Sequence, residues 1–307
     1  MALQINRNHR LPEGQYFHEF TPKSGICLHH TVGGSALSTI NYWAGNAEMV
    51  GTAYIIERDG VIYEVFDPRC WAWQCGLKWP DEQRIAFEKR FIGIELASEG
   101  GLIEHDGELY CFDRISERTR KDRAEAFDYG QEYRGYRYFD RYEPPQVAAL
   151  VELVNHLCDE FGIERQVPAD YLGFHGTKLA NFEGVIGHVN IRLDKSDPAP
   201  DVEFWEAVIN GCHLERVSIF NELEELFEHN IQQLSQLNRA AAAVVKGLLY
   251  ELQRGDRDTY IKLYDPAPGG HVIHYKLIRG NPDLVRRLAG ALGFKTVTEN
   301  TLEVFHG

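Results

Sequence analysis

The sequence predicts an α/β fold over about the first two thirds of its 307 residues, followed by a helical and small α+β C-terminal region. Two patterns predict the α/β part: short apolar runs bounded by turn residues, and amphipathic stripes with helical spacing. A third pattern is a long apolar stripe over residues 214–253, which predicts one long or two stacked amphipathic helices. We therefore expect one domain over residues 1–213 and a separate region over residues 214–307.

The first elements are predicted from apolar runs and turn signals. In chain order they are a buried strand at residues 25–32, a short helix begun near Ser38, a hairpin of residues 53–56 and 61–65, and a strand at residues 92–96. The first strand is closed by Gly33-Gly34, and the hairpin turns at Asp59-Gly60. Strands and helices therefore alternate from the start of the domain.

The later elements include a polar insertion at residues 98–142 that is rich in tyrosine and phenylalanine. Its rings either line a cleft or pack the insertion on the domain, and the sequence leaves both readings open. Pro144-Pro145 opens a helix whose apolar residues form one stripe. The C-terminal end predicts a small α+β part, with strands at residues 271–278 and 301–305 and a helix at residues 282–292.

The composition is that of a folded enzyme, with 44% hydrophobic and 25% charged residues. A net charge of -14 argues against nucleic-acid binding, because phosphates require a basic face. The N-terminus lacks the apolar core of a signal peptide, and no window is apolar enough to span a membrane. We expect a protein that is made in the cytoplasm.

The six cysteines lack the paired spacing of a structural zinc site. Cys70 and Cys75 are close enough in sequence to form a disulfide in an oxidising compartment. Without an export signal, the expected state of the cysteines is reduced.

Candidate metal ligands stand in two separate segments. His29 and His30 end the first predicted strand, where alternation points their side chains to opposite faces, so only one can reach a given ion. His188 and Asp197 lie nine residues apart in a polar stretch that one loop can bring to a single ion. Two histidines and one carboxylate are the ligands of an open catalytic zinc site.

Each of these residues also has a simpler reading. Both histidines can be buried without a metal, and Asp197-Pro198 is a common way to open a turn. Lys195 stands two residues before Asp197, where it is either a surface charge or a cation that stabilises an oxyanion.

Four blocks of sequence, in order, resemble the zinc-dependent N-acetylmuramoyl-L-alanine amidases of the type-2 amidase and peptidoglycan-recognition protein group. The blocks span about two thirds of the chain. They are Leu28-His29-His30-Thr31, the hairpin segment 51–60 with its Arg-Asp-Gly turn, Ile92-Gly93-Ile94-Glu95-Leu96, and Gly187-His188 with Lys195-Ser196-Asp197-Pro198. No block is specific alone, but chance does not readily give four in order.

The resemblance implies a central mixed β-sheet flanked by helices and a Zn²⁺ ion held by His29, His188 and Asp197. It implies that Lys195 assists at the oxyanion. Glu95 would be the general base, which fits a carboxylate in an otherwise apolar strand, since such a charge needs a partner or a purpose.

The chain also departs from this family's pattern. Thr52 stands where some members have a tyrosine near the metal, and Tyr54 follows it by two residues. Trp73 and Gln74 replace an aromatic-histidine pair, and glutamine cannot act as an acid or base near neutral pH. We expect these four residues to bind substrate, and catalysis to rest on Glu95 and Lys195.

The function expected from the resemblance is hydrolysis of the amide between N-acetylmuramic acid and L-alanine in peptidoglycan. Two alternatives are a recognition module that binds muropeptides without cleaving them, and a zinc hydrolase of the same fold that acts on another amide. The biological setting is open between an endolysin, an antibacterial effector delivered to the periplasm or cell wall, and a recycling enzyme. Residues 214–307 show no resemblance to a known family, and they either pack on the domain, self-associate, bind a protein partner or bind the cell wall.

Overall fold

The computed structural model describes residues 3–46, 48–111, 115–219, 262–264 and 272–275. Contacts between residues divide the chain into two compact units, Met1–Ile219 and Phe220–Gly307. Among the described residues, none of the helices has the length and apolar character needed to cross a lipid bilayer.

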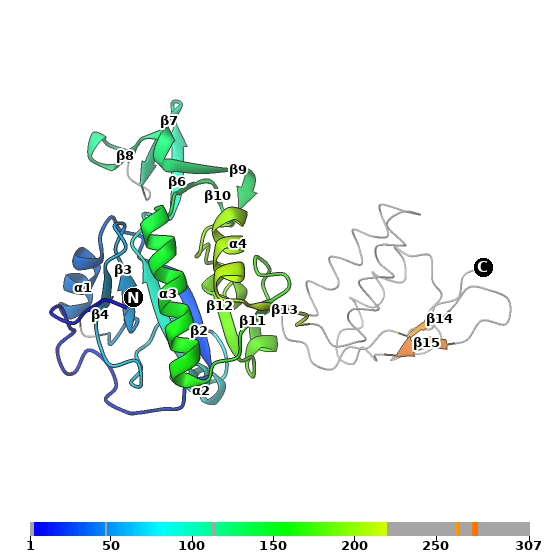
Figure 1. Cartoon of the computed structure of the whole chain (residues 1–307). Helices are drawn as coiled ribbons and strands as arrows, with labels where there is room; N and C mark the ends of the chain where they lie inside the picture. The colour runs from blue at the N-terminus through cyan, green and yellow to red at the C-terminus, as the bar shows by residue number, and fades with distance from the viewer. Residues whose placement is uncertain (1–2, 47, 112–114, 220–261, 265–271, 276–307) are drawn as a thin grey trace. The chain divides into compact units, whose positions relative to one another are not determined.

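A six-stranded mixed sheet forms the centre of the first unit (Figure 1). Strand β2 lies between β5 and β12 and pairs with both in parallel, whereas β3 pairs with β4 as an antiparallel hairpin. The predicted mixed sheet is confirmed. In sheet order the strands are β1 (Ile5–Asn6), β4 (Ile62–Glu64), β3 (Tyr54–Ile56), β5 (Phe91–Leu96), β2 (Gly25–His30) and β12 (Gly184–Gly187).

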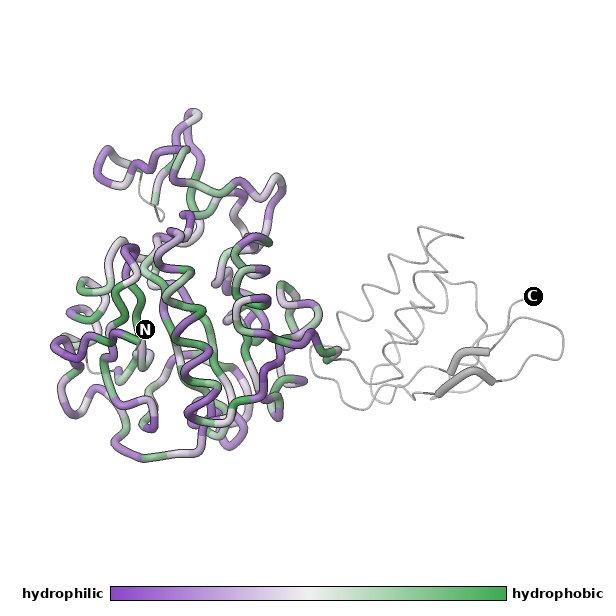
Figure 2. Tube along the Cα trace, viewed as in Figure 1, coloured by the Kyte–Doolittle hydropathy of each residue, from purple (hydrophilic) through white to green (hydrophobic). Residues whose placement is uncertain are grey.

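The inner strands are buried over their whole length because structure covers both of their faces. Every residue of β2 and β5 is buried, as is usual for parallel strands, and Figure 2 shows hydrophobic residues gathered along the inner strands. Such burial leaves little room for side chains at two glycines. A Cβ at Gly25 would lie 2.3 Å from the Phe91 ring, and one at Gly93 would lie 2.1 Å from the Gln74 amide oxygen.

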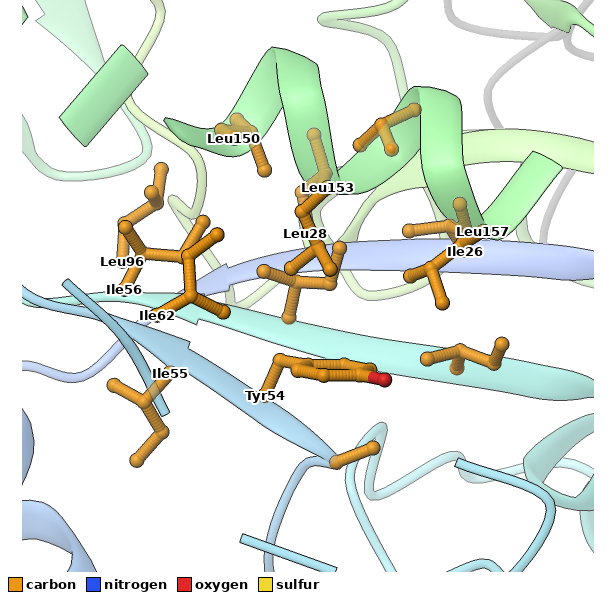
Figure 3. Close-up of a cluster of buried hydrophobic side chains, with 14 of the residues drawn as sticks. Ile26, Leu28, Tyr54, Ile55, Ile56, Ile62, Leu96, Leu150, Leu153 and Leu157 are labelled. Atoms are coloured by element: carbon orange, nitrogen blue, oxygen red, sulfur yellow. The ribbon is translucent and has the colours of Figure 1, made fainter. Parts of the chain in front are cut away.

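Helices cover the sheet. Helix α3 (Pro144–Phe161) begins at the predicted Pro144-Pro145 pair and ends at Gly162, which has the left-handed conformation that glycine adopts without strain. Its leucines point at the side chains of β2 and β5 in the main core (Figure 3). The other α-helices of the described residues are α1 (Ala36–Ala44), α2 (Asp81–Arg90) and α4 (Val202–Gly211).

The polar insertion follows β5 and precedes α3 in the sequence. It forms a separate antiparallel sheet, at the top of Figure 1. Its strands in sheet order are β8 (Arg120–Lys121), β7 (Glu108–Cys111), β6 (Gly101–His105), β10 (Tyr136–Asp140) and β9 (Ala126–Tyr133). Tyr138 and Phe139 are buried, and Tyr133 donates its hydroxyl to Leu172 O at 2.8 Å. Several of its rings therefore pack the insertion on the domain.

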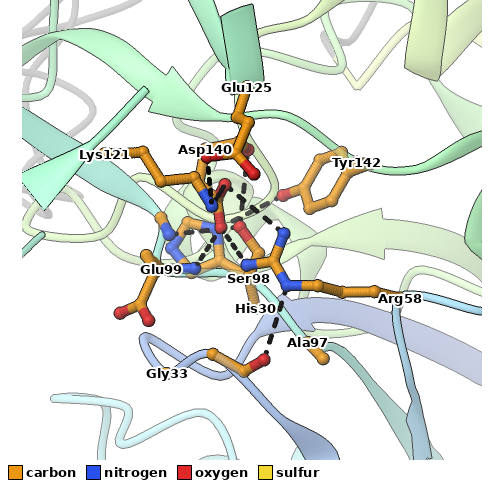
Figure 4. A network of polar contacts seen from close by, with 12 residues as sticks. His30, Gly33, Arg58, Ala97, Ser98, Glu99, Lys121, Glu125, Asp140 and Tyr142 are labelled. Atoms are coloured by element: carbon orange, nitrogen blue, oxygen red, sulfur yellow. Dashed lines mark hydrogen bonds and ion pairs between the residues drawn. The ribbon is translucent and has the colours of Figure 1, made fainter. Parts of the chain in front are cut away.

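A buried ionic cluster fastens the insertion to the central sheet (Figure 4). The side chain of Asp140, fully buried at the end of β10, pairs with Arg58 of the β3–β4 hairpin and with Lys121 at 2.9 Å. It also accepts the backbone N–H of Glu99 at 2.7 Å. Burial opposes ionisation, but Arg58 keeps the pKa of Asp140 below its ordinary value.

Short elements complete the described structure. Strand β11 (Gln166–Pro168) pairs in parallel with β13 (Glu215–Val217), just beyond the predicted boundary at residue 213. In the second unit, β14 (Lys262–Tyr264) pairs antiparallel with β15 (Val272–Tyr275), which falls within the predicted strand at residues 271–278. The helices predicted within residues 214–253 and 282–292 and the strand at residues 301–305 lie outside the described residues, apart from residues 214–219. The division at residue 213 stays a prediction.

We predict that Asp140→Asn lowers the free energy of unfolding by about 3 kcal/mol, because Arg58 and Lys121 would lose the charge that balances them. Urea unfolding measures this value. Asp128→Asn is the matched control, since Asp128 pairs with Arg137 on the exposed surface of the same sheet and should cost less than about 1 kcal/mol. Equal losses in the two variants would contradict the anchoring role of Asp140.

Candidate metal centre and active site

The strand register brings His29 and His188 together. His29 is near the carboxyl end of β2, and in the adjacent strand β12 Gly187 pairs with Leu28. His188, the next residue, therefore lies beside His29 where β12 passes into a short 3-10 turn, His188–Asn190. Asp197 returns to the same point because its carbonyl accepts the N–H of Val189 at 2.9 Å and closes the loop.

Three donor atoms converge at this point. His29 Nδ1 and His188 Nδ1 lie 3.0 Å apart, and Asp197 Oδ2 lies 3.2 Å from the first and 3.0 Å from the second. Ligand atoms around a tetrahedral ion with bonds of 2.0–2.1 Å are separated by roughly 3.3 Å. The spacing therefore fits three ligands of one small metal ion. His30 is not one of the converging donors, and its Nδ1 lies 3.2 Å from the Tyr142 hydroxyl instead.

The outer contacts of His188 and Asp197 suit them to hold a cation. His188 Nε2 lies 2.9 Å from the backbone oxygen of Cys75, so this nitrogen carries the proton and Nδ1 is left free to bind a metal. Burial opposes the ionisation of Asp197, but His188 and His29 hold its pKa well below the ordinary value. The site thus offers an imidazole nitrogen and an ionised carboxylate.

Tyr142 joins the back of β2 to the loop that carries Asp197. The Tyr142 hydroxyl lies 3.2 Å from His30 Nδ1 and accepts the N–H of Ala199 at 2.9 Å (Figure 4 shows His30 and Tyr142). All three groups are buried. His30 therefore helps to position the metal site through Tyr142.

Glu95 stands on the other side of His29, because the register of β5 against β2 pairs these two residues. Its side chain has no hydrogen-bond partner for Oε2, although Glu95 is only 9% exposed. Burial raises the pKa of Glu95 to about 7, with His29 opposing the rise and Asp197 adding to it. A carboxylate that gains and loses a proton near neutral pH is suited to general acid and base catalysis.

A cavity of about 340 Å³ opens onto these groups. Seven of the nine residues predicted for the site line it: His29, Thr52, Gln74, Glu95, His188, Lys195 and Asp197. The sequence did not single out two other lining residues, Arg134 and Tyr136 of the insertion. Only the spatial packing of the insertion reveals them.

Trp73 and Tyr54 do not line the cavity. Trp73 packs edge-on against Trp71 and Phe17, and the Arg84 guanidinium lies 5.0 Å from its ring centre. Tyr54 is 2% exposed and lies in the main core (Figure 3). Thr52 precedes β3, so the two-residue alternation of a strand does not carry Tyr54 to the same side.

Two buried cysteines form a further group that the sequence did not indicate. Ligand atoms of Cys27, His29 and Cys75 all lie within 4.8 Å of one another. Cys27 and Cys75 are fully buried and do not line the cavity, and all six cysteines are free. This group is closed to solvent, whereas a catalytic metal needs a position for water.

Helix α2 supports the segment that carries Gln74 and Cys75. Glu88 is fully buried and accepts the backbone N–H groups of Gln74 and Cys75 at 3.1 Å. Burial raises the pKa of Glu88 to about 7. Glu88 thereby holds the backbone of Cys75, whose carbonyl oxygen accepts a hydrogen bond from His188 Nε2.

An open three-residue metal site beside a buried carboxylate is the arrangement of a hydrolase that activates water. The amino-acid sequence then gives the family. Residues 19–200 match the N-acetylmuramoyl-L-alanine amidase family, and because this match covers more than half of the chain, the protein belongs to that family and is an amidase of peptidoglycan.

Solved structures with similarity to this chain include several amidases and endolysins. A point mutant of PlyL is 14% identical, with 69% of this chain and 99% of that chain covered and a TM-score of 0.41. The amidase AmiD from E. coli, in complex with anhydro-N-acetylmuramic acid-L-Ala-D-γ-Glu-L-Lys, is 16% identical, with coverage of 62% and 59% and a TM-score of 0.38. The amidase LysC from Clostridium intestinale URNW is 16% identical, with coverage of 69% and 99% and a TM-score of 0.37. Among curated proteins, none matches the chain.

We predict that Tyr142→Phe weakens Zn²⁺ binding roughly tenfold, because the loss of the hydroxyl leaves His30 and the Ala199 N–H without their shared partner and loosens the Asp197 loop. Competition with a chromogenic chelator measures the affinity. Tyr129→Phe removes a hydroxyl from the insertion at a position that does not line the cavity, and it should bind Zn²⁺ as the unaltered protein does. An unchanged affinity in Tyr142→Phe would show that the hydroxyl does not position the site.

Proposed function

We propose that the protein hydrolyses the amide between N-acetylmuramic acid and L-alanine with Zn²⁺ held by His29, His188 and Asp197. The observation that carries this proposal is the convergence of the three donor atoms within 3.2 Å, beside Glu95, in an open cavity. Family membership supplies the reaction class.

The donor set fits zinc. Two imidazoles and one carboxylate are donors that zinc takes in catalytic sites, and they leave one position open. When bound there, zinc would act as a Lewis acid that polarises the scissile carbonyl and makes water a nucleophile at neutral pH. The remaining steps fall to the side chains of the chain itself.

Glu95 is the proposed general base. With a pKa of about 7, it can take a proton from the attacking water and return that proton to the leaving amine of L-alanine. Its position beside His29 and its unpaired oxygen support this role. The proton that enters with water thus leaves on the new peptide amino group.

Lys195 is the proposed partner of the oxyanion. It is half-buried, lines the cavity and makes no ion pair within the described residues. A cation that lacks a protein partner is available to the negative charge that develops on the carbonyl oxygen during attack.

Gln74 and Thr52 are the proposed contacts to substrate. Gln74 donates its amide to the Phe91 carbonyl at 2.8 Å, which leaves its buried oxygen without a partner at the cavity. Thr52 donates its hydroxyl to Tyr54 O at 2.9 Å, so its oxygen lone pairs remain free. Both residues therefore present acceptors to N–H groups of a bound peptide.

The proposed substrate joins a muramic sugar to a peptide that begins with L-alanine. The AmiD complex contains such a molecule, in which glutamate is linked through its γ-carboxyl group. We propose a ligand of this class here, met in the cell wall after release or delivery of the enzyme. Whether the biological setting is lysis, antagonism or recycling would follow from a preference for polymer or for soluble fragments.

We predict that a soluble muropeptide is cleaved to a peptide with N-terminal L-alanine, that chelation abolishes turnover, and that added Zn²⁺ restores it. Glu95→Gln should lower kcat by about 10²- to 10⁴-fold while Zn²⁺ still binds, because the variant removes the proton acceptor and leaves the ligands. Mass spectrometry identifies and quantifies the cleaved peptide, and competition with a chelator measures Zn²⁺ binding.

The matched control is Glu99→Gln, which alters a half-buried glutamate that does not line the cavity and should leave kcat unchanged. Binding of the muropeptide without cleavage would mark a recognition module. A product other than the L-alanine-terminated peptide would mean that a different amide is the substrate.

A further inference from the structure

The hairpin between β9 and β10 presents an arginine in an uncommon backbone conformation. Tyr133 pairs with Tyr136, so Arg134 and Gly135 form a two-residue turn in which both have positive φ, +53° and +91°. Asparagine or glycine is preferred at the first position of this turn, since other side chains are strained there. An arginine in this place suggests that its side chain is needed.

The turn brings Arg134 to the active-site cavity. Of the described residues of the insertion sheet, only Arg134 and Tyr136 line the cavity. Arg134 Nη1 donates to Leu193 O at 2.8 Å, in the loop between His188 and Asp197. The ring of Tyr136 covers Gly101 so closely that a Cβ there would lie 2.3 Å from it. The hairpin tip is thus held against the catalytic loop.

Charge pairing distinguishes Arg134 from most arginines of the insertion. Arg120, Arg123 and Arg137 pair with acidic side chains, and Arg118 and Arg141 are exposed to solvent. Within the described residues, Arg134 pairs with none, although it is half-buried and the chain has a net charge of -14. Asp194, the acidic residue of the cavity that is not assigned to metal or catalysis, is already paired with Arg192.

The Arg134 guanidinium, which lies 5.7 Å from the centre of the Tyr133 ring, has no acidic partner among the described residues and can offer N–H donors to a group in the cavity. One of its five N–H groups is used by Leu193 O, and the planar group can bind a carboxylate with two parallel hydrogen bonds. Lys195 is the second unpaired cation of the cavity and already has a place at the oxyanion. Two cations with separate tasks imply two negative groups on the substrate, one transient and one permanent.

We infer that Arg134 binds the free α-carboxylate of the γ-linked glutamate that follows L-alanine in the stem peptide. The inference rests on the proposed function, which brings such a peptide into the cavity. A γ-linked glutamate leaves its α-carboxylate free, one residue beyond the scissile amide. The insertion thereby makes the enzyme selective for stem peptides with an acid at this position over those with an amide.

Two synthetic N-acetylmuramoyl peptides that differ only in this group, free acid or carboxamide, test the inference. We expect the unaltered protein to favour the acid by roughly 10- to 100-fold in kcat/KM, which is the range of a charge-assisted hydrogen bond. Arg134→Gln should lose this preference through a higher KM for the acid. Arg134→Lys should keep part of this preference, because lysine retains the positive charge but lacks the planar guanidinium that donates two parallel hydrogen bonds.

The control variant is Arg137→Gln, which removes an exposed arginine of the same hairpin and should keep the full preference. If the unaltered protein cleaves acid and amide equally, or if Arg134→Gln keeps the preference, the assigned subsite is wrong while the proposed function stands. If Arg134→Gln slows both substrates equally, Arg134 only supports the catalytic loop. If neither peptide is cleaved by the zinc-loaded protein, the proposed function itself fails.

Discussion

The parallel pairing of β2 with β5 on one side and β12 on the other is the constraint on which the site depends. Because the register is set by completely buried strands, His29 is held between Glu95 and the start of the His188 turn. A shift of one residue would turn Ile26 and Leu28 of β2 away from the main core. The packing that sets the strand register therefore also sets the distances between the catalytic groups.

Two groups of buried charge have opposite characters. Around Asp140, each carboxylate oxygen is met by a cation or an N–H group, as is expected where charge serves only structure. In the cavity, Glu95 Oε2 and the Gln74 oxygen have no partner, and neither has His29 Nε2 just behind it. Substrate and metal can satisfy these polar groups when they bind.

Helix α3 and the inner strands could be predicted because each leaves a local signal, a Pro-Pro start or a buried apolar run. The mixed sheet and the choice of His29 over His30 as a candidate ligand followed only from the resemblance to the amidase family. Tyr54 shows the limit of strand alternation, since Thr52 lies outside the strand and Tyr54 is in the core. Arg134 and the Cys27–Cys75 neighbourhood could not be predicted. They depend on contacts between segments far apart in the chain, for which spacing gives no signal.

Two groups of candidate ligands share His29: one adds His188 and Asp197, and the other adds Cys27 and Cys75. The central question is which of the two groups holds the metal ion. X-ray absorption at the zinc edge of the zinc-loaded protein measures the atoms around the ion directly. We expect nitrogen and oxygen neighbours at about 2.0–2.1 Å, with the signature of two imidazoles and no sulfur. Sulfur neighbours at about 2.3 Å would place the ion with Cys27 and Cys75, and would contradict a catalytic metal held by His29, His188 and Asp197.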